Sequence, residues 1–212
     1  LHDALPISSV MAFGPVYDVC IQGNYAYLAI NSDDKYRLQV IDITDPDWML
    51  SITLLSLPES VYGICIKGNY AYLSLSHSIL VVNTTDPANP IICAKFENGR
   101  YNMDISVTAD KIYVATSGGI EVFDLITPTM LKDKGLIYQS SSGSSGVAVD
   151  NLGHIYLTSF NDYTFRILDS DGVQLGAIRP SFVWTPGDIH LYGTVAYVSG
   201  MDTLWRLDTS DP

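Results

Sequence analysis

The chain has 212 residues, of which 47% are hydrophobic and 16% charged, and its formal net charge at neutral pH is −12. Nucleic-acid binding is disfavoured, because such surfaces cluster Lys and Arg, whereas the 11 basic residues here are scattered singly. Attraction to anionic membranes is disfavoured for the same reason, and no apolar run approaches the roughly 18 residues that a spanning helix needs. With 16 Gly and 14 Tyr, the composition favours an all-β protein of short strands and tight turns.

The first seven residues do not read as native sequence. Residues 1–7, LHDALPI, are the translation of CTACACGACGCTCTTCCGATC, the end of a common short-read sequencing adapter. We therefore interpret residues 1–7 as a non-native artefact and residues 8–212 as a single domain. The alternative is a natural exposed tail.

A segment centred on a tyrosine recurs five times, at intervals of about 41 to 45 residues. A period in the forties with strand-like content predicts a β-propeller of four-stranded antiparallel blades. We expect the repeats near residues 16–60, 61–100, 101–143, 144–184 and 185–212. The tyrosines that mark them are Tyr27, Tyr72, Tyr113, Tyr156 and Tyr197.

Each repeat contains the same sequence of predicted elements. An alternating first strand is followed by a tight turn such as Gly23-Asn24, then by the strand that carries the tyrosine. The third strand is mostly apolar and ends on a short polar residue that we expect to cap the next turn, and a fourth strand leads to the next repeat. These predicted caps are Asp42, Asn83, Asp124, Asp169 and Asp208. Asn83 also begins a glycosylation triplet, but we interpret it as a cap.

The two ends of the repeat array are incomplete in the sequence. Residues 8–14 resemble the fourth strand of a preceding blade, and the fifth repeat stops at Asp211-Pro212 before its own fourth strand. We expect a fragment of a longer protein, forming an open arc from a ring of six to eight blades. The alternative is a closed five-bladed ring in which residues 9–13 complete the last blade.

The first two repeats resemble a known family. The segments VYDVCIQGNYAYLAI to LQVIDITDP and VYGICIKGNYAYLSL to ILVVNTTDPANP are similar to LVIVD repeats. GVAVDNLGHIYLTSFNDYTFRILDSDG resembles an NHL repeat, and IYVATSGGIEVFD the YVTN class. The resemblance implies a propeller and an exported protein at a bacterial or archaeal cell surface. The LVIVD family carries no established catalytic residues, so it implies none here.

The three cysteines fit no disulfide framework. Cys20 and Cys65 occupy the same position in successive repeats, where the third and fourth repeats have Ser106 and Ala148, so this is a small packing position. Cys93 lies alone in a predicted outer strand. We expect three free thiols.

Three aspartates recur nine residues before their tyrosine, near the start of the predicted innermost strand. These residues are Asp18, Asp104 and Asp188. Innermost strands of a propeller line its central channel, so the three carboxylates could share one space and bind a hard cation such as Ca²⁺. The alternative is that each one accepts hydrogen bonds from backbone amides of a neighbouring loop, a role that is commoner for Asp.

Two further sets of residues are expected near the channel mouth. His190 takes the small packing position of the fifth repeat, and we expect it to be buried and hydrogen-bonded rather than a ligand. The second set is aromatic and could form a binding platform for a glycan or peptide; the alternative is that these side chains pack between blades. Its candidate residues are Tyr17, Tyr62, Tyr101 and Trp184.

The sequence contains none of the common catalytic motifs, neither a phosphate-binding Gly-rich loop nor a nucleophile elbow. We therefore expect a non-catalytic module that binds protein or carbohydrate through its loops and channel mouth. The alternative is a channel-centred enzyme, a metal-dependent hydrolase or a quinoprotein-like protein, in which the three aspartates and His190 supply ligands or a base.

Overall fold

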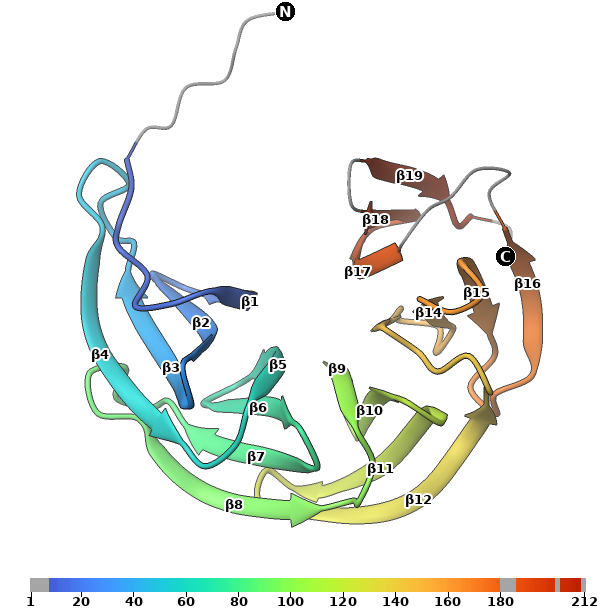
Figure 1. Ribbon diagram of the computed structural model, residues 1–212, viewed down its shortest axis with the longest axis horizontal. Helices are drawn as coiled ribbons and strands as arrows, with labels where there is room; N and C mark the ends of the chain where they lie inside the picture. The colour runs from blue at the N-terminus through green and yellow to red at the C-terminus, as the bar shows by residue number, and fades with distance from the viewer. Residues whose placement is uncertain (1–7, 180–185, 201–202, 211–212) are drawn as a thin grey trace, which may run out of the picture.

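The computed structural model describes residues 8–179, 186–200 and 203–210. The regular secondary structure of these residues is all β-strand, arranged in five antiparallel sheets that follow one another as the blades of a propeller (Figure 1). No helix in this described part of the chain could span a membrane. The predicted all-β propeller is confirmed. Residues 1–7 lie outside the described residues.

The first three blades each have four strands in chain order. Blade 1 comprises β1 (Val16–Gln22), β2 (Tyr25–Ser32), β3 (Lys35–Asp42) and β4 (Leu50–Leu57). Blade 2 comprises β5 (Val61–Lys67), β6 (Tyr70–Leu75), β7 (Ser78–Asn83) and β8 (Ile91–Glu97). Blade 3 comprises β9 (Asn102–Val107), β10 (Lys111–Thr116), β11 (Gly119–Thr127) and β12 (Met130–Gln139).

The last two blades differ in their number of strands. Blade 4 comprises β13 (Gly146–Val149), β14 (Ile155–Ser159), β15 (Thr164–Leu168) and β16 (Gln174–Ile178). Within the described residues, blade 5 has three strands, which are β17 (Pro186–Tyr192), β18 (Val195–Gly200) and β19 (Leu204–Asp208).

The hydrophobic core lies between adjacent blades, because each sheet contributes side chains from both of its faces. We call the face that packs on the next blade in chain order the forward face. Tyr27, Tyr72, Tyr113 and Tyr156 lie on forward faces and are fully buried in four successive inter-blade clusters. Tyr197 is only half-buried, since no described residue forms a blade beyond it.

The blades form an open arc, with a gap between blade 1 and blade 5 (Figure 1). The strands β1, β5, β9, β13 and β17 face the centre of the arc, and β4, β8, β12 and β16 form its outer edge. The arrangement agrees with the predicted arc; a complete ring of six to eight blades stays a prediction.

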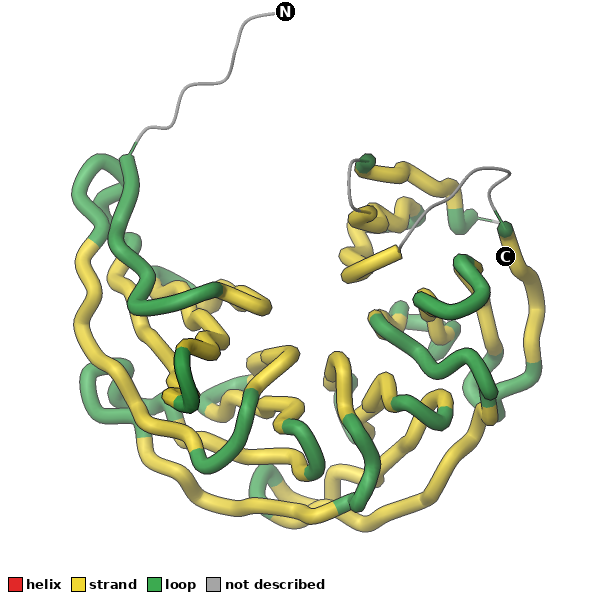
Figure 2. The backbone as a smooth tube through the Cα atoms, viewed as in Figure 1, coloured by secondary structure: helices red, strands yellow, loops and turns green. Residues whose placement is uncertain are grey.

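The segment before β1 corrects one prediction. Residues 8–14 form no strand and run as a loop along blade 1 (Figure 2). Gln39 holds this segment, because its side-chain oxygen accepts the N–H of Phe13 at 3.2 Å and its nitrogen donates to the carbonyl of Met11 at 3.0 Å. Val10 and Ala12 pack on the face of blade 1 opposite its forward face, which we call the backward face. Residues 9–13 therefore do not complete blade 5.

The predicted caps are confirmed at four of five positions. The side chains of Asp42, Asn83, Asp169 and Asp208 each accept the backbone N–H two residues later, at 2.8 to 3.0 Å. The prediction is wrong for Asp124, because β11 continues through it to Thr127. The carboxylate of Asp124 instead lies 3.7 Å from the ammonium of Lys134. All three cysteines are free thiols, as predicted.

Candidate binding site at the channel mouth

A cavity of about 260 Å³ opens at the centre of the arc, where the innermost strands begin. Five of the eight predicted site residues line it, and Met103, Ser145, Phe160 and Gly187 complete its wall. The five predicted residues are Tyr17, Asp18, Tyr62, Asp104 and Asp188. Trp184, also predicted here, lies outside the described residues. The repeat thus places side chains that are far apart in sequence around one space.

The three aspartates share one local geometry. In each, one carboxylate oxygen accepts the N–H of the following residue, at 2.6 Å for Asp18 and Asp188 and 2.7 Å for Asp104. Each strand has a register shift at its aspartate, which takes this part of the chain out of regular pairing. The shift lies between Val16 and Asp18 in β1, between Asn102 and Asp104 in β9, and between Pro186 and Ile189 in β17. The same strand position thus gives the three aspartates the same local hydrogen bond.

Two of the aspartates also connect neighbouring blades. The second oxygen of Asp18 accepts the N–H of Ile64 in blade 2 at 2.7 Å. The second oxygen of Asp104 accepts the N–H of Val147 in blade 4 at 2.8 Å. The interpretation that these carboxylates bind backbone amides is thus confirmed for Asp18 and Asp104, but the amides belong to strands β5 and β13 and not to a loop.

Burial raises the pKa of all three carboxyl groups, and the charges of neighbouring aspartates add to the rise for Asp18 and Asp104. Burial raises the pKa of Asp18 to about 7, the N–H of Ile64 opposes this rise, and the charge of Asp188 adds to it. Burial raises the pKa of Asp104 well above its ordinary value, and the charges of Asp188 and Asp18 add to the effect. Burial also raises the pKa of Asp188, against the N–H of Ile189 and the charge of His190. The three groups titrate as an interacting set.

The carboxylates do not form a metal centre in this arrangement. Among the residues that the structure describes, no three His, Cys, Asp or Glu side chains lie close enough together to hold one ion. At Asp18 and Asp104, the oxygens that a cation would bind are already bonded to backbone N–H groups. The geometry therefore gives the Ca²⁺ hypothesis no support.

An aromatic cluster forms the rim beside this cavity. The rings of Tyr17 and Tyr62 meet edge to face with centroids 5.7 Å apart, and the ring of Tyr101 lies 5.4 Å from that of Tyr62. His77 extends the cluster, meeting Tyr101 edge to face at 5.9 Å. Tyr17 and Tyr101 remain 54% and 40% exposed. The hydroxyl of Tyr101 donates to that of Tyr62, and burial together with Tyr62 raises the pKa of Tyr101 to about 12.

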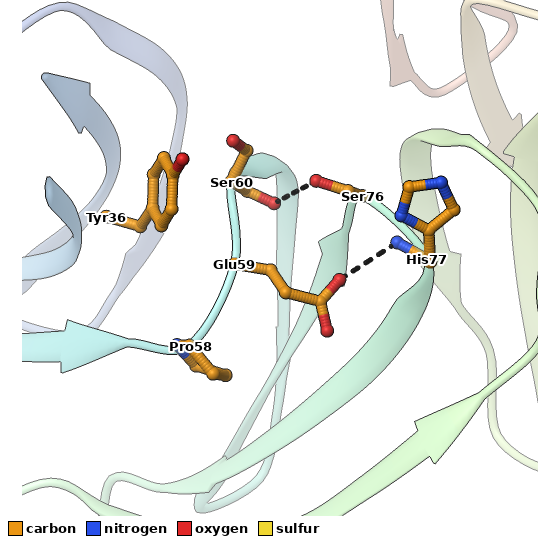
Figure 3. A pocket seen from close by; sticks show the side chains of 6 residues that line it. All are labelled: Tyr36, Pro58, Glu59, Ser60, Ser76 and His77. Atoms are coloured by element: carbon orange, nitrogen blue, oxygen red, sulfur yellow. Dashed lines mark hydrogen bonds between the residues drawn. The ribbon is translucent and has the colours of Figure 1, made fainter. Parts of the chain in front are cut away.

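A second hollow, which sequence reasoning missed, is lined in part by His77 at the end of this cluster. Figure 3 shows the side chains that line it. Its volume is about 420 Å³, and its lining is Tyr36, Pro58, Glu59, Ser60, Ser76 and His77. Glu59 accepts the N–H of His77 at 3.1 Å and pairs with Lys95 at 2.6 Å. Burial opposes ionisation of Glu59, but bonds from Lys95, His77 and Ser78 outweigh it and lower its pKa. The residues come from three separate segments, so no repeat position marks them.

His190 corrects another prediction. The expectation that it is buried is wrong, because it is exposed and does not line the cavity. The equivalent Cys20 and Cys65 are half-buried, because blades 2 and 3 cover the forward faces that carry them. The strand places His190 on the forward face as the repeat predicts, and the lack of a covering blade in the described residues leaves it exposed.

Solved structures similar to this chain show the fold. A Lactobacillus plantarum protein is 15% identical with a TM-score of 0.73, the match covering 91% of this chain and 67% of that chain. The periplasmic gluconolactonase of Pseudomonas aeruginosa is 13% identical with a TM-score of 0.75, covering 97% and 71%. The β-propeller domain of Myceliophteria thermophila Cps50 (Swd1) is 14% identical with a TM-score of 0.70, covering 93% and 72%. Identities this low show the fold alone.

Sequence comparison identifies the repeats of the first two blades. The LVIVD repeat matches residues 13–50, which include β1 to β3, and residues 60–97, which include β5 to β8. No curated protein matches the sequence. The chain is therefore a β-propeller whose first two blades are LVIVD repeats.

Proposed function

We propose that this chain is a non-catalytic binding module that takes a carbohydrate ligand at the channel mouth, with a protein segment as the competing ligand class. The observation that carries the proposal is the cluster of Tyr17, Tyr62 and Tyr101, in which Tyr17 and Tyr101 are exposed and which lies between two hollows. An apolar surface with a few converging polar groups is the usual form of a ligand site.

The chemistry of the rim suits a sugar. Exposed tyrosine rings offer flat apolar surface for the C–H groups of a sugar ring, and their hydroxyls offer hydrogen bonds at its edge. The carboxyl group of Asp188 lies in the adjoining cavity, where it can accept a hydrogen bond from a sugar hydroxyl. The rigid blades hold these groups in place, so little conformational freedom is lost on binding.

The proposed setting is the outside of a prokaryotic cell. Its support is the resemblance of the first two blades to LVIVD repeats, which implies an exported protein. A binding module of this kind would act at the cell surface or after secretion.

A glycan-array screen followed by calorimetry tests the proposal. Tyr17→Ala should weaken binding of any glycan that the chain retains by about tenfold, since it removes one stacking surface. Tyr192→Ala is the matched control, because Tyr192 is also exposed but lies at the opposite end of an innermost strand. Equal loss in both variants, or binding that is insensitive to Tyr17, would contradict the assignment. Binding of peptides alone would favour the competing class.

One observation supports a channel-centred enzyme as the second candidate. A carboxyl group with a pKa of about 7, as at Asp18, is suited to general acid catalysis at neutral pH. The similarity in fold to a gluconolactonase makes a lactone the first substrate to assay. Lactone hydrolysis that is lost in Asp18→Asn would favour this candidate over the binding module; no hydrolysis would count against it. No observation favours the quinoprotein-like form.

A further inference from the structure

Aspartate and glycine alternate at one position of the innermost strands. The residues, from blade 1 to blade 5, are Asp18, Gly63, Asp104, Gly146 and Asp188. The alternation has a hydrogen-bonding consequence. In the aspartate blades, the N–H that follows this position is bound by the blade's own carboxylate. In the glycine blades, the corresponding N–H is free to bind the aspartate of the preceding blade.

The glycines also leave room for the aspartate blade that follows them. A Cβ atom on Gly63 would lie 2.7 Å from a carboxylate oxygen of Asp104 and 3.0 Å from its Cα. A Cβ atom on Gly146 would lie 2.7 Å from the carbonyl oxygen of Gly187 and 3.3 Å from the Cα of Asp188. Each glycine blade is thus suited to an aspartate blade on both sides.

Blade 5 is an aspartate blade, but among the described residues no following blade covers its forward face. One oxygen of Asp188 accepts the N–H of Ile189, as in the other aspartate blades. Its other oxygen receives no N–H from a following blade among the described residues. On the same face, Tyr197 is half-buried, whereas Tyr27, Tyr72, Tyr113 and Tyr156 are fully buried. The outer edge of β19 is also unpaired in the described sheet, where the other blades have a fourth strand.

We infer that the forward face of blade 5 binds one further blade of the same polypeptide, whose innermost strand carries glycine followed by a free backbone N–H. That blade continues the alternation and supplies the N–H for Asp188. In the first four blades an outer strand leads into the next innermost strand, so one segment would pair with β19 and bring the new blade onto Asp188. The inference goes beyond the proposed ligand site and does not depend on it.

Blade 1 does not fit this face, whether it comes from the same molecule or from a second copy. The N–H of Val19 is already bound to Asp18 at 2.6 Å, so blade 1 has no free donor at the required place. Val10 and Ala12 also cover part of its backward face, packing on Ala26, Leu28 and Ile30. The same argument opposes closure of a five-bladed ring.

The forward face of blade 5 is more polar than that of blade 2. In blade 5, His190 and Arg206 are the residues paired with Tyr197 on the two adjacent strands. The equivalent partners of Tyr72 in blade 2 are Cys65 and Val81. A blade that packs well on blade 2 therefore need not pack equally well on blade 5. The hydrogen bond to Asp188 is best tested after His190 and Arg206 have been replaced by the residues of blade 2.

Two fusions of the full chain provide the test, both carrying His190→Cys and Arg206→Val. The first adds residues 47–98 after Pro212, which supply β4 and the glycine blade 2. The second adds residues 88–140, which supply β8 and the aspartate blade 3. Both join after an Asp-Pro pair, as in the native chain. The readouts are thermal unfolding and hydrogen exchange of the β17 and β18 amides.

We expect the glycine-blade fusion to protect β17 and β18 at least tenfold more strongly than the aspartate-blade fusion. Adding Asp188→Asn to the first fusion should remove most of that protection, while Asp188→Asn in the unfused chain should have little effect. Equal protection in both fusions, or protection that is indifferent to Asp188, overturns the inference. Lack of docking in either fusion overturns it as well, as does a stable dimer of the unfused chain in light scattering.

Discussion

Blades 2 and 5 are built from the same repeat but differ in what covers them. In blade 2, Tyr72 is 1% exposed, because blade 3 packs on the forward face that carries it. In blade 5, Tyr197 occupies the equivalent strand position and is half-buried, and the neighbouring His190 is exposed. The repeat therefore determines which way a side chain points, while the next blade determines whether it is buried, as expected for an array stabilised by nearest-neighbour contacts.

Truncation of the two tyrosines should show the largest difference between these blades. Tyr72→Ala removes a buried ring and its hydroxyl, which donates to the carbonyl of Pro128 at 3.1 Å. We expect a loss of about 3–5 kcal/mol in the free energy of unfolding, and about 1 kcal/mol for Tyr197→Ala. Urea denaturation of both variants measures the difference. Similar losses would mean that blade 5 is covered in solution.

Replacing the small residue between blades 2 and 3 should have the next largest effect. Gly63→Ala places a methyl group 2.7 Å from a carboxylate oxygen of Asp104, so the two blades must separate or Asp104 must move. We expect a loss of about 1–3 kcal/mol. Gly176→Ala is the matched control, because a methyl group at this position of the outer strand β16 would have nothing within 4 Å. A Gly63→Ala variant as stable as this control would disprove the close contact.

The pH dependence of stability tests whether ionisation of the channel carboxyl groups destabilises the folded protein. The folded pKa of Asp18, about 7, exceeds the ordinary value of 3.8, so the folded state binds the proton more tightly. Ionised Asp18 therefore destabilises the folded state above pH 7, and this destabilisation is progressively lost as the pH falls from 7 towards 4. We expect about 1–3 kcal/mol over that window.

Asp18→Asn should flatten this part of the stability profile measured by urea denaturation between pH 4 and 8. The variant keeps one carbonyl acceptor, so a cost of about 1 kcal/mol from the lost second bond is expected at every pH. A profile as steep as that of the unmodified chain would show that Asp18 does not carry the effect.

The smallest effect is expected at the surface of blade 2. Lys95 pairs with Glu59 at 2.6 Å and with Glu97 at 2.7 Å, and its side chain is 35% exposed. Because water and salt screen such pairs, Lys95→Ala should cost less than about 1 kcal/mol, and less again at high salt. Thermal unfolding at two ionic strengths measures this. A larger loss would show that Glu59 depends on Lys95 for its place beside His77.

The fold followed from sequence because its signals are local and repeated. Strand alternation, turn residues and the recurring tyrosine each act within one blade, so the strands of the described blades could be predicted. The segment of residues 8–14 could not, because its apolar pattern suits either a paired strand or a loop packed on a sheet. Asp124 failed as a cap because β11 runs on to Thr127, a difference that the shared third-strand pattern does not reveal.

The candidate site was only partly predictable. The aspartates could be placed at the channel because they keep a fixed distance from the tyrosine, and the strand direction then brings them together. The hollow beside Glu59 and His77 depends on how the connection before β5 meets the turn after β6, which no spacing rule describes. Whether His190 is buried depends on a neighbouring blade, and the repeat itself carries no information on that.

The cysteines make the molecule easy to attach at one known place. Burial raises the pKa of the Cys65 thiol to about 12 and also raises that of Cys20, so both stay protonated and unreactive at neutral pH. Cys93 is exposed on β8, the outer strand of blade 2. A maleimide dye or a surface linker would therefore couple at the outer edge of the arc, in a single orientation, and would leave the central cavity open to ligands in solution.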